Sequence, residues 1–79
     1  MGKTQIKLNI TNNIRVLRAE KKISQEHLAN EIEVTRATIN SIERGKYNPS
    51  LELAFKIAIF FKKDVTEIFK LEESNEQAW

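Results

Sequence analysis

The stretch from Ser24 to Tyr47, SQEHLANEIEVTRATINSIERGKY, constrains the fold more than any other part of the chain. Its apolar residues recur at helical spacing on both sides of a short interruption, which predicts two short helices joined by a tight turn. At about 100° per residue, Ile39 and Ile42 fall on one side of the second helix. The opposite side carries short polar and cationic residues that no core requires: Arg36, Ala37, Asn40, Ser41 and Arg44.

That second side has the chemistry needed to read base edges in a DNA major groove, where arginine pairs with guanine and asparagine with adenine. The same residues would also suit an ordinary solvated surface. The DNA interpretation is favoured by the helix placed before them and by the basic residues on their flanks. The sequence therefore predicts that this outward side of the second helix reads base edges.

The length of 79 residues predicts one domain, residues 1–79, with one small core and no room for an effector domain. A hydrophobic share of 41% with only 2 Gly and 1 Pro is typical of a compact helical protein. The chain has no cysteine, which excludes disulfides and thiolate metal sites. No apolar run approaches the roughly 20 residues of a membrane span, and the start lacks a signal-peptide pattern, so we expect a cytoplasmic protein.

The formal net charge of +2 is unevenly spread. Residues 1–22 contain six basic residues and one acidic residue, whereas the last fourteen contain one basic and four acidic residues. A polyanionic partner would therefore meet the front of the molecule and not its tail.

The two ends of the chain have the alternating pattern of strands. Apolar residues alternate with polar ones over Thr4–Ile10, and a second candidate strand lies at Ile68–Glu72. A two-stranded sheet is marginal alone, so we expect these strands to pair across a dimer interface as well. The alternative is that the N-terminal residues form a frayed arm.

Side chains that can accept a hydrogen bond from a free backbone N–H precede each predicted helix. They are Thr11 or Asn12 for the first helix, which ends near Lys21, Ser24 for the second, Thr35 for the third, Ser50 for the fourth and Asp64 for a short fifth. Gly45 is placed to end the third helix. The fourth, predicted over 51–63, has core spacing at Leu51, Ala54, Ile57, Ala58 and Phe61. Its further apolar residues, Phe55, Ile59 and Phe60, exceed one stripe and predict a second interface.

The segment IRVLRAEKKISQEHLANEIEVTRATINSIERGKYNPSLELAFKIAIFF resembles the small helix-turn-helix domain of phage repressors, Cro proteins and related bacterial and archaeal regulators. The resemblance covers residues 12–69, with the helix-turn-helix at about 24–44. It is strongest for short regulators of the cytolysin-operon repressor type, in which strands from both termini form a dimer sheet. It implies an all-α fold of five helices with a small sheet of N- and C-terminal strands at a dimer interface.

The resemblance also implies roles for individual residues. The third helix would enter the major groove while the second crosses the backbone. Base edges would be faced by Arg36, Ala37, Asn40 and Ser41. Gln25 would meet a phosphate and brace these base-reading residues. Arg18 and Glu43 match a pair that forms an internal salt bridge in the family. Phosphate contacts would come from Gln25, Thr35, Thr38, Arg44, Lys46, Tyr47 and Asn48. The expected dimer interface consists of Ile6, Leu8, Ile10, Phe60, Phe69 and Leu71.

Two positions depart from the family pattern. Glu33 stands in the turn where the family often has glycine, so either the turn is not left-handed there or the position is strained by about 1 kcal/mol. Ala37 stands where many relatives have glutamine, and it could touch only a thymine methyl group. The operator sequence of relatives therefore does not transfer to this chain.

The leading hypothesis is a homodimeric, sequence-specific regulator of transcription, a repressor, that binds double-stranded DNA at a palindromic operator with third helices about 34 Å apart. The alternative is a protein-binding helical module, antitoxin-like or coactivator-like, that uses exposed apolar residues of the fourth helix. An enzyme is not expected, because the only histidine, His27, has no evident acid or base partner. We also expect no cofactor, no metal site, no membrane contact and no small-molecule effector.

Overall fold

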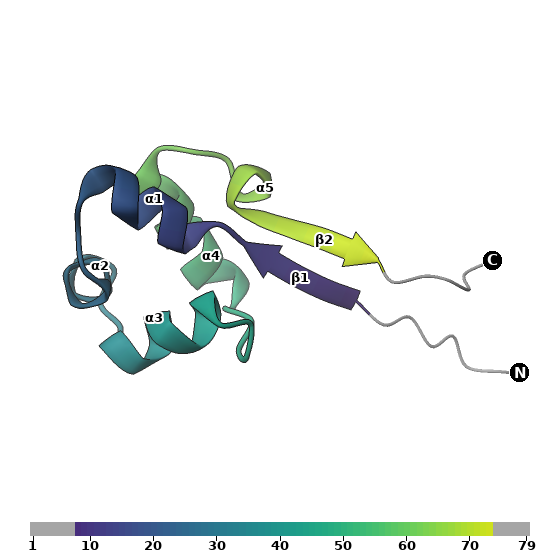
Figure 1. Cartoon of the computed structure of the whole chain (residues 1–79), viewed down its shortest axis with the longest axis horizontal. Helices are drawn as coiled ribbons and strands as arrows, with labels where there is room; N and C mark the ends of the chain where they lie inside the picture. Colours follow the sequence, from purple (N-terminus) through teal and green to yellow (C-terminus); the bar gives the residue numbers. More distant parts are fainter. Residues whose placement is uncertain (1–7, 74–79) are drawn as a thin grey trace, which may run out of the picture.

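The structure, a computed structural model, describes residues 8–73 and shows a helical body from which two strands project as a ribbon (Figure 1). The elements in chain order are β1 (Leu8–Asn12), α1 (Ile14–Lys21), α2 (Gln25–Glu31), α3 (Arg36–Glu43), α4 (Leu51–Phe61), α5 (Val65–Ile68) and β2 (Phe69–Glu73). The predicted architecture of five helices with a small terminal sheet is confirmed.

One hydrophobic core joins all five helices. Its fully buried large side chains come from every helix, and each stabilises the fold by roughly 1.5–3 kcal/mol relative to an exposed position. They are Ile14, Leu28, Ile39, Ile42, Ile57 and Ile68. The buried methyl group of Ala29, on α2, belongs to the same cluster. Within the described residues, no helix is long and apolar enough to cross a bilayer.

The caps of the three middle helices are as predicted. Ser24 Oγ accepts from His27 N at 2.9 Å, and Ser50 Oγ accepts from Leu53 N at 3.1 Å. Thr11 or Asn12 was predicted to cap α1, but the helix begins at Ile14 and Asn13 occupies the N-cap position, two residues after Thr11 and one after Asn12. Asn12 still contributes, because its Oδ1 accepts from Ile14 N at 3.1 Å.

Two predictions for α4 are wrong. The helix ends at Phe61 because Lys62 adopts the left-handed conformation at φ 58°. Leu51, expected in the core, is 71% exposed, and Leu53 is buried instead. Leu51 lies about 200° around the helix from Leu53, so the two cannot share one buried face.

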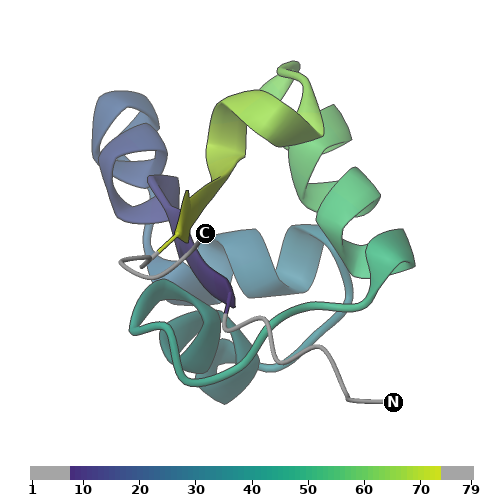
Figure 2. The same cartoon turned by 90° about the vertical axis from the view of Figure 1, so that its right-hand side faces the viewer.

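The strands pair with each other in the same chain, antiparallel, with Ile10 opposite Leu71 and Asn12 opposite Phe69. The N-terminal strand was predicted over Thr4–Ile10, of which residues 4–7, including Ile6, lie outside the described residues, as does Trp79. The C-terminal strand begins one residue later than predicted, at Phe69. Figure 2 looks at the molecule from the ribbon end, with the helices arranged around it.

Candidate nucleic-acid interface

The helices α2 and α3 cross at a steep angle. Figure 1 shows α2 end-on while α3 lies nearly in the plane, and the quarter turn in Figure 2 exchanges the two orientations. The contact is close because α2 presents Ala29, 1% exposed, to the core. The turn folds back onto α2 through the bond from Val34 N to Ala29 O at 2.9 Å. This arrangement is a helix-turn-helix.

The turn contains Glu33 at φ 63°, in the left-handed region, without a glycine. Of the two possibilities that the sequence left open, the left-handed turn is therefore the one present. A residue with a Cβ there costs on the order of 1 kcal/mol. The Glu33 side chain is 82% exposed and its Oε1 lies 3.9 Å from Lys56 Nζ, a separation and an exposure at which an ion pair contributes little.

The two sides of α3 differ as the spacing predicts. Ile39 and Ile42 are buried in the core. The N-cap Thr35 starts the helix by accepting from Thr38 N at 3.1 Å. The outward side carries the predicted base-reading residues; Arg36 and Ala37 are exposed, and Asn40 and Ser41 are partly buried. The chain therefore brings all four residues to one side of one short helix.

The carboxylate of Glu43, at the end of α3, is the centre of a hydrogen-bond network. Its side chain is 1% exposed and accepts two bonds from Arg18, from Nε at 2.6 Å and from Nη2 at 3.1 Å. This confirms the ion pair expected between Arg18 and Glu43. The bond to Glu43 raises the pKa of Arg18, against the opposing effect of burial, so the guanidinium stays charged.

Gln25 joins this network to the outward side of α3. Its Nε2 donates to Glu43 Oε1 at 3.1 Å and to Asn40 Oδ1 at 3.3 Å. The first residue of α2 therefore touches both the buried carboxylate and one predicted base-reading side chain.

The other predicted phosphate-contacting residues lie at the two ends of α3. At its start, the hydroxyl oxygens of Thr35 and Thr38 are 3.0 Å apart. At its end, Gly45 adopts φ 76° and the chain turns back, with Lys46 N bonded to Ser41 O at 2.9 Å. The residues at this end are all exposed: Arg44, Lys46, Tyr47 and Asn48.

Comparison with known proteins agrees with this geometry. The family model described as Helix-turn-helix matches residues 14–68. The chain belongs to the helix-turn-helix family of transcriptional regulators. It is 48% identical over 62 residues to a transcriptional regulator of this type from Methanocaldococcus jannaschii, covering 78% of this chain and 94% of the relative.

This helix-turn-helix chain is also similar to two named proteins. The transcriptional repressor RstR of the cryptic phage CTXphi in Vibrio cholerae is 37% identical over 62 residues, which cover 78% of this chain and 56% of RstR. The crystal structure of the restriction-modification controller protein C.AhdI from Aeromonas hydrophila superposes with a TM-score of 0.63 at 35% identity, covering 68% of this chain and 78% of that one.

Sequence reasoning missed one contact of the helix-turn-helix network. Arg15 Nε lies 3.9 Å from Glu43 Oε1, although the Arg15 side chain is 73% exposed. The spacing of three residues between Arg15 and Arg18 on α1 could have shown that both face the same way. Because the separation between Arg15 and Glu43 is long and the Arg15 side chain is well solvated, this ion pair contributes little to stability.

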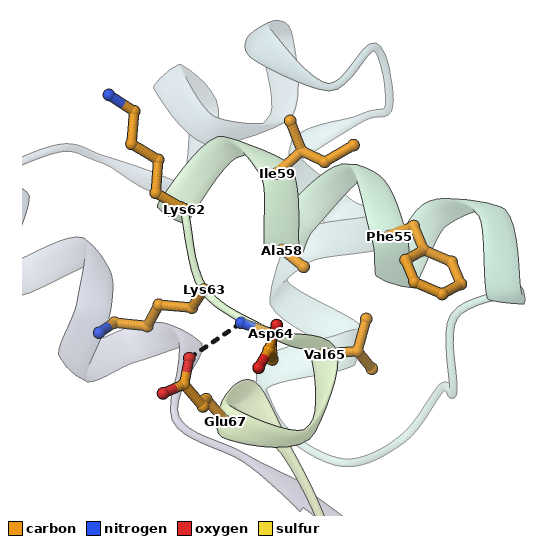
Figure 3. Close-up of a pocket in the computed structure, with 8 residues that line it drawn as sticks. All are labelled: Phe55, Ala58, Ile59, Lys62, Lys63, Asp64, Val65 and Glu67. Atoms are coloured by element: carbon orange, nitrogen blue, oxygen red, sulfur yellow. Dashed lines mark hydrogen bonds between the residues drawn. The ribbon is translucent and has the colours of Figure 1, made fainter.

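A depression of about 400 Å³ lies between the end of α4 and α5, lined by no residue of α2 or α3 (Figure 3). Its apolar rim includes Phe55 and Ile59, which are 51% and 74% exposed. Its polar groups bond locally, as Asp64 N does to Glu67 Oε1 at 2.9 Å. Among residues 8–73, no group of three or more His, Asp or Glu side chains is arranged so that it could hold a metal ion.

Proposed function

We propose that the protein is a sequence-specific DNA-binding repressor that inserts α3 into the major groove. The observation that carries this proposal is the outward side of α3. Its residues Arg36, Asn40 and Ser41 are not needed for the core, yet the helix that bears them is fixed by buried Ile39 and Ile42 and by the Glu43 network. A rigid helix with a free polar side is what base reading in the major groove requires.

In this proposal Arg36, Ala37, Asn40 and Ser41 face base edges. Residues at the two ends of α3 lie along phosphates, where they position the protein without reading sequence. They are Thr35, Thr38, Arg44, Lys46, Tyr47 and Asn48, joined by the backbone N–H of Gln25 at the start of α2, which has no acceptor within its helix.

We further propose that the protein binds a palindromic operator as a homodimer. Strand alternation and the pairing of Ile10 with Leu71 put Leu8, Ile10, Phe69 and Leu71 on one face of the ribbon. Leu8 and Leu71 remain 57% and 55% exposed, whereas Phe69, like Phe60 of α4, packs partly against the core of its own chain. An apolar face on a ribbon that is marginal alone favours pairing with a second copy.

The bound protein would repress transcription by occluding the promoter, and the similarity to the repressor RstR supports repression rather than activation. The proposed role needs no catalysis, and its place is the cytoplasm, together with the DNA. The alternative function, a protein-binding helical module, stays a prediction that the exposed residues of α4 motivate.

The proposal is tested by measuring the affinity of variants for a DNA site selected with the wild-type protein. Arg36→Ala and Asn40→Ala should each weaken binding by about 1–3 kcal/mol and relax the base preference at one position of each half-site. Lys63→Ala, which removes an exposed cation beyond α4, is the control and should bind as the wild type does. Wild-type affinity in both α3 variants would show that this side of the helix does not read the DNA.

A further inference from the structure

The buried Glu43 carboxylate has only one hydrogen-bonding capability. An ionised carboxylate accepts and cannot donate. Two hydrogen bonds from Arg18, one to each carboxylate oxygen, fix the orientation of this side chain, since a guanidinium fork and a carboxylate form a strong pair with defined geometry. Whatever else touches Glu43 must therefore be a donor.

This requirement fixes the orientation of the Gln25 amide. Its terminal atom 3.1 Å from Glu43 Oε1 must be the NH₂ nitrogen, because an amide oxygen in that place would face another acceptor at hydrogen-bond distance. The NH₂ group has two hydrogens. One goes to Glu43, which leaves the other for Asn40 at 3.3 Å.

The orientation of the Asn40 amide follows in turn. The atom that faces the Gln25 donor must be its oxygen, Oδ1, and so its NH₂ group lies on the other side. Among the described residues Nδ2 of Asn40 has no protein acceptor, and it is not one of the buried polar atoms without a partner. The Asn40 NH₂ group therefore stays accessible at the outer side of α3.

We propose that Arg18, Glu43 and Gln25 set the direction of the Asn40 amide, so that Asn40 meets its base as a hydrogen-bond donor. This inference rests on the proposed function. The acceptors that the major groove offers are N7 of either purine, O6 of guanine and O4 of thymine, whereas cytosine presents a donor, its N4 amino group. Asn40 thus disfavours cytosine at the base that it touches. Gln25 is a positioning residue that acts through Asn40.

The test is selection of bound fragments from a random DNA library with four proteins: the wild type, Gln25→Leu, Gln25→Lys and Asn40→Asp. Leucine removes the donor, and Asn40 becomes free to turn. Lysine is donor-only and should still orient Asn40. Aspartate keeps the shape of asparagine and replaces the outward NH₂ by an acceptor, which pairs with the cytosine amino group. Thermal melting of each protein checks that it is folded.

The wild type should disfavour cytosine by roughly five- to tenfold at one position of each half-site, as expected for one hydrogen bond. Gln25→Leu should abolish that preference, Gln25→Lys should retain it, and Asn40→Asp should shift it toward cytosine. An enriched wild-type site with the same base preferences in all four proteins would overturn the inference and leave the proposed function standing. No enriched site for the wild type would overturn both.

A measurement without DNA tests separately whether the Gln25 amide is hydrogen-bonded to Glu43 and Asn40. The side-chain NH₂ hydrogens of Gln25 should exchange with solvent several-fold more slowly than those of the exposed Asn30 and Asn48, because both are hydrogen-bonded. Gln25 hydrogens that exchange as fast as those of Asn48 would overturn the inference, whatever the DNA selection shows.

Discussion

The end of the molecule that carries α2 and α3 differs from the ribbon of β1 and β2 in how it places polar and apolar side chains. At the helical end a carboxylate is buried, with its oxygens bonded to Arg18 and Gln25. At the ribbon end two leucines, Leu8 and Leu71, are more than half exposed. The first region satisfies its buried charge within one chain, whereas the second leaves apolar surface uncovered.

The difference shows which contacts each region needs. The helix-turn-helix positions its DNA-facing residues through contacts inside the chain, so one protomer is enough to shape that side of α3. The ribbon has only two strands and leaves Leu8 and Leu71 exposed, and a second copy would bury this apolar face.

The largest effect is expected from Arg18→Met, which leaves the buried Glu43 without its charged partner. Breaking a buried ion pair in this way costs about 3–5 kcal/mol of unfolding free energy. Arg15→Met is the matched control, since Arg15 is 73% exposed and its loss should change stability by less than about 0.5 kcal/mol. Urea denaturation of both variants at pH 7 measures the difference. Equal stabilities would mean that the helical end does not depend on this pair.

The next effect is expected in the ribbon. The double variant Leu8→Thr with Leu71→Thr replaces both leucines by threonine, which also favours strands. It should weaken the dimer by about 2 kcal/mol or more, which is roughly a 30-fold increase in the dissociation constant. The control is Asn9→Thr with Lys70→Thr, on the opposite face of the same strands. Sedimentation equilibrium gives both constants. A double leucine variant that dimerises like the control would place the dimer contact elsewhere.

The smallest effects concern the two left-handed positions that flank α3. Glu33→Gly should stabilise the fold by up to about 1 kcal/mol, because glycine adopts φ 63° without a Cβ penalty. Gly45→Ala should destabilise it by about 1 kcal/mol through its φ of 76° alone, since a Cβ there meets nothing within 4 Å. Thermal unfolding of both variants checks the signs, and a stabilising Gly45→Ala would contradict the argument.

The features that sequence predicted well are local. The caps at Ser24, Thr35 and Ser50 depend on a side chain and a backbone N–H three residues away, and all three are present. The inward side of α3 follows from a helical period in which Ile39 and Ile42 are the only large apolar residues. Such signals need no knowledge of how the helices are arranged in space.

The errors have a common cause, which is the absence of tertiary information. The helix α4 is apolar on more than one side, so its period could not decide between Leu51 and Leu53 for the core. The contact from Gln25 to Asn40 depends on the angle at which α2 crosses α3, which no local pattern encodes, so only the family resemblance implied that Gln25 would brace the base-reading residues. The family resemblance anticipated the pair of Arg18 and Glu43, which spacing alone would not have predicted.

The central claim is that two copies of this chain read a DNA site with α3. Selection from a random duplex library at moderate salt, with excess competitor DNA to suppress sequence-independent phosphate binding, tests it most directly. The account predicts an enriched inverted repeat whose half-sites are about 10 bp apart, centre to centre. Salt-sensitive binding to bulk DNA without any enriched sequence would contradict it.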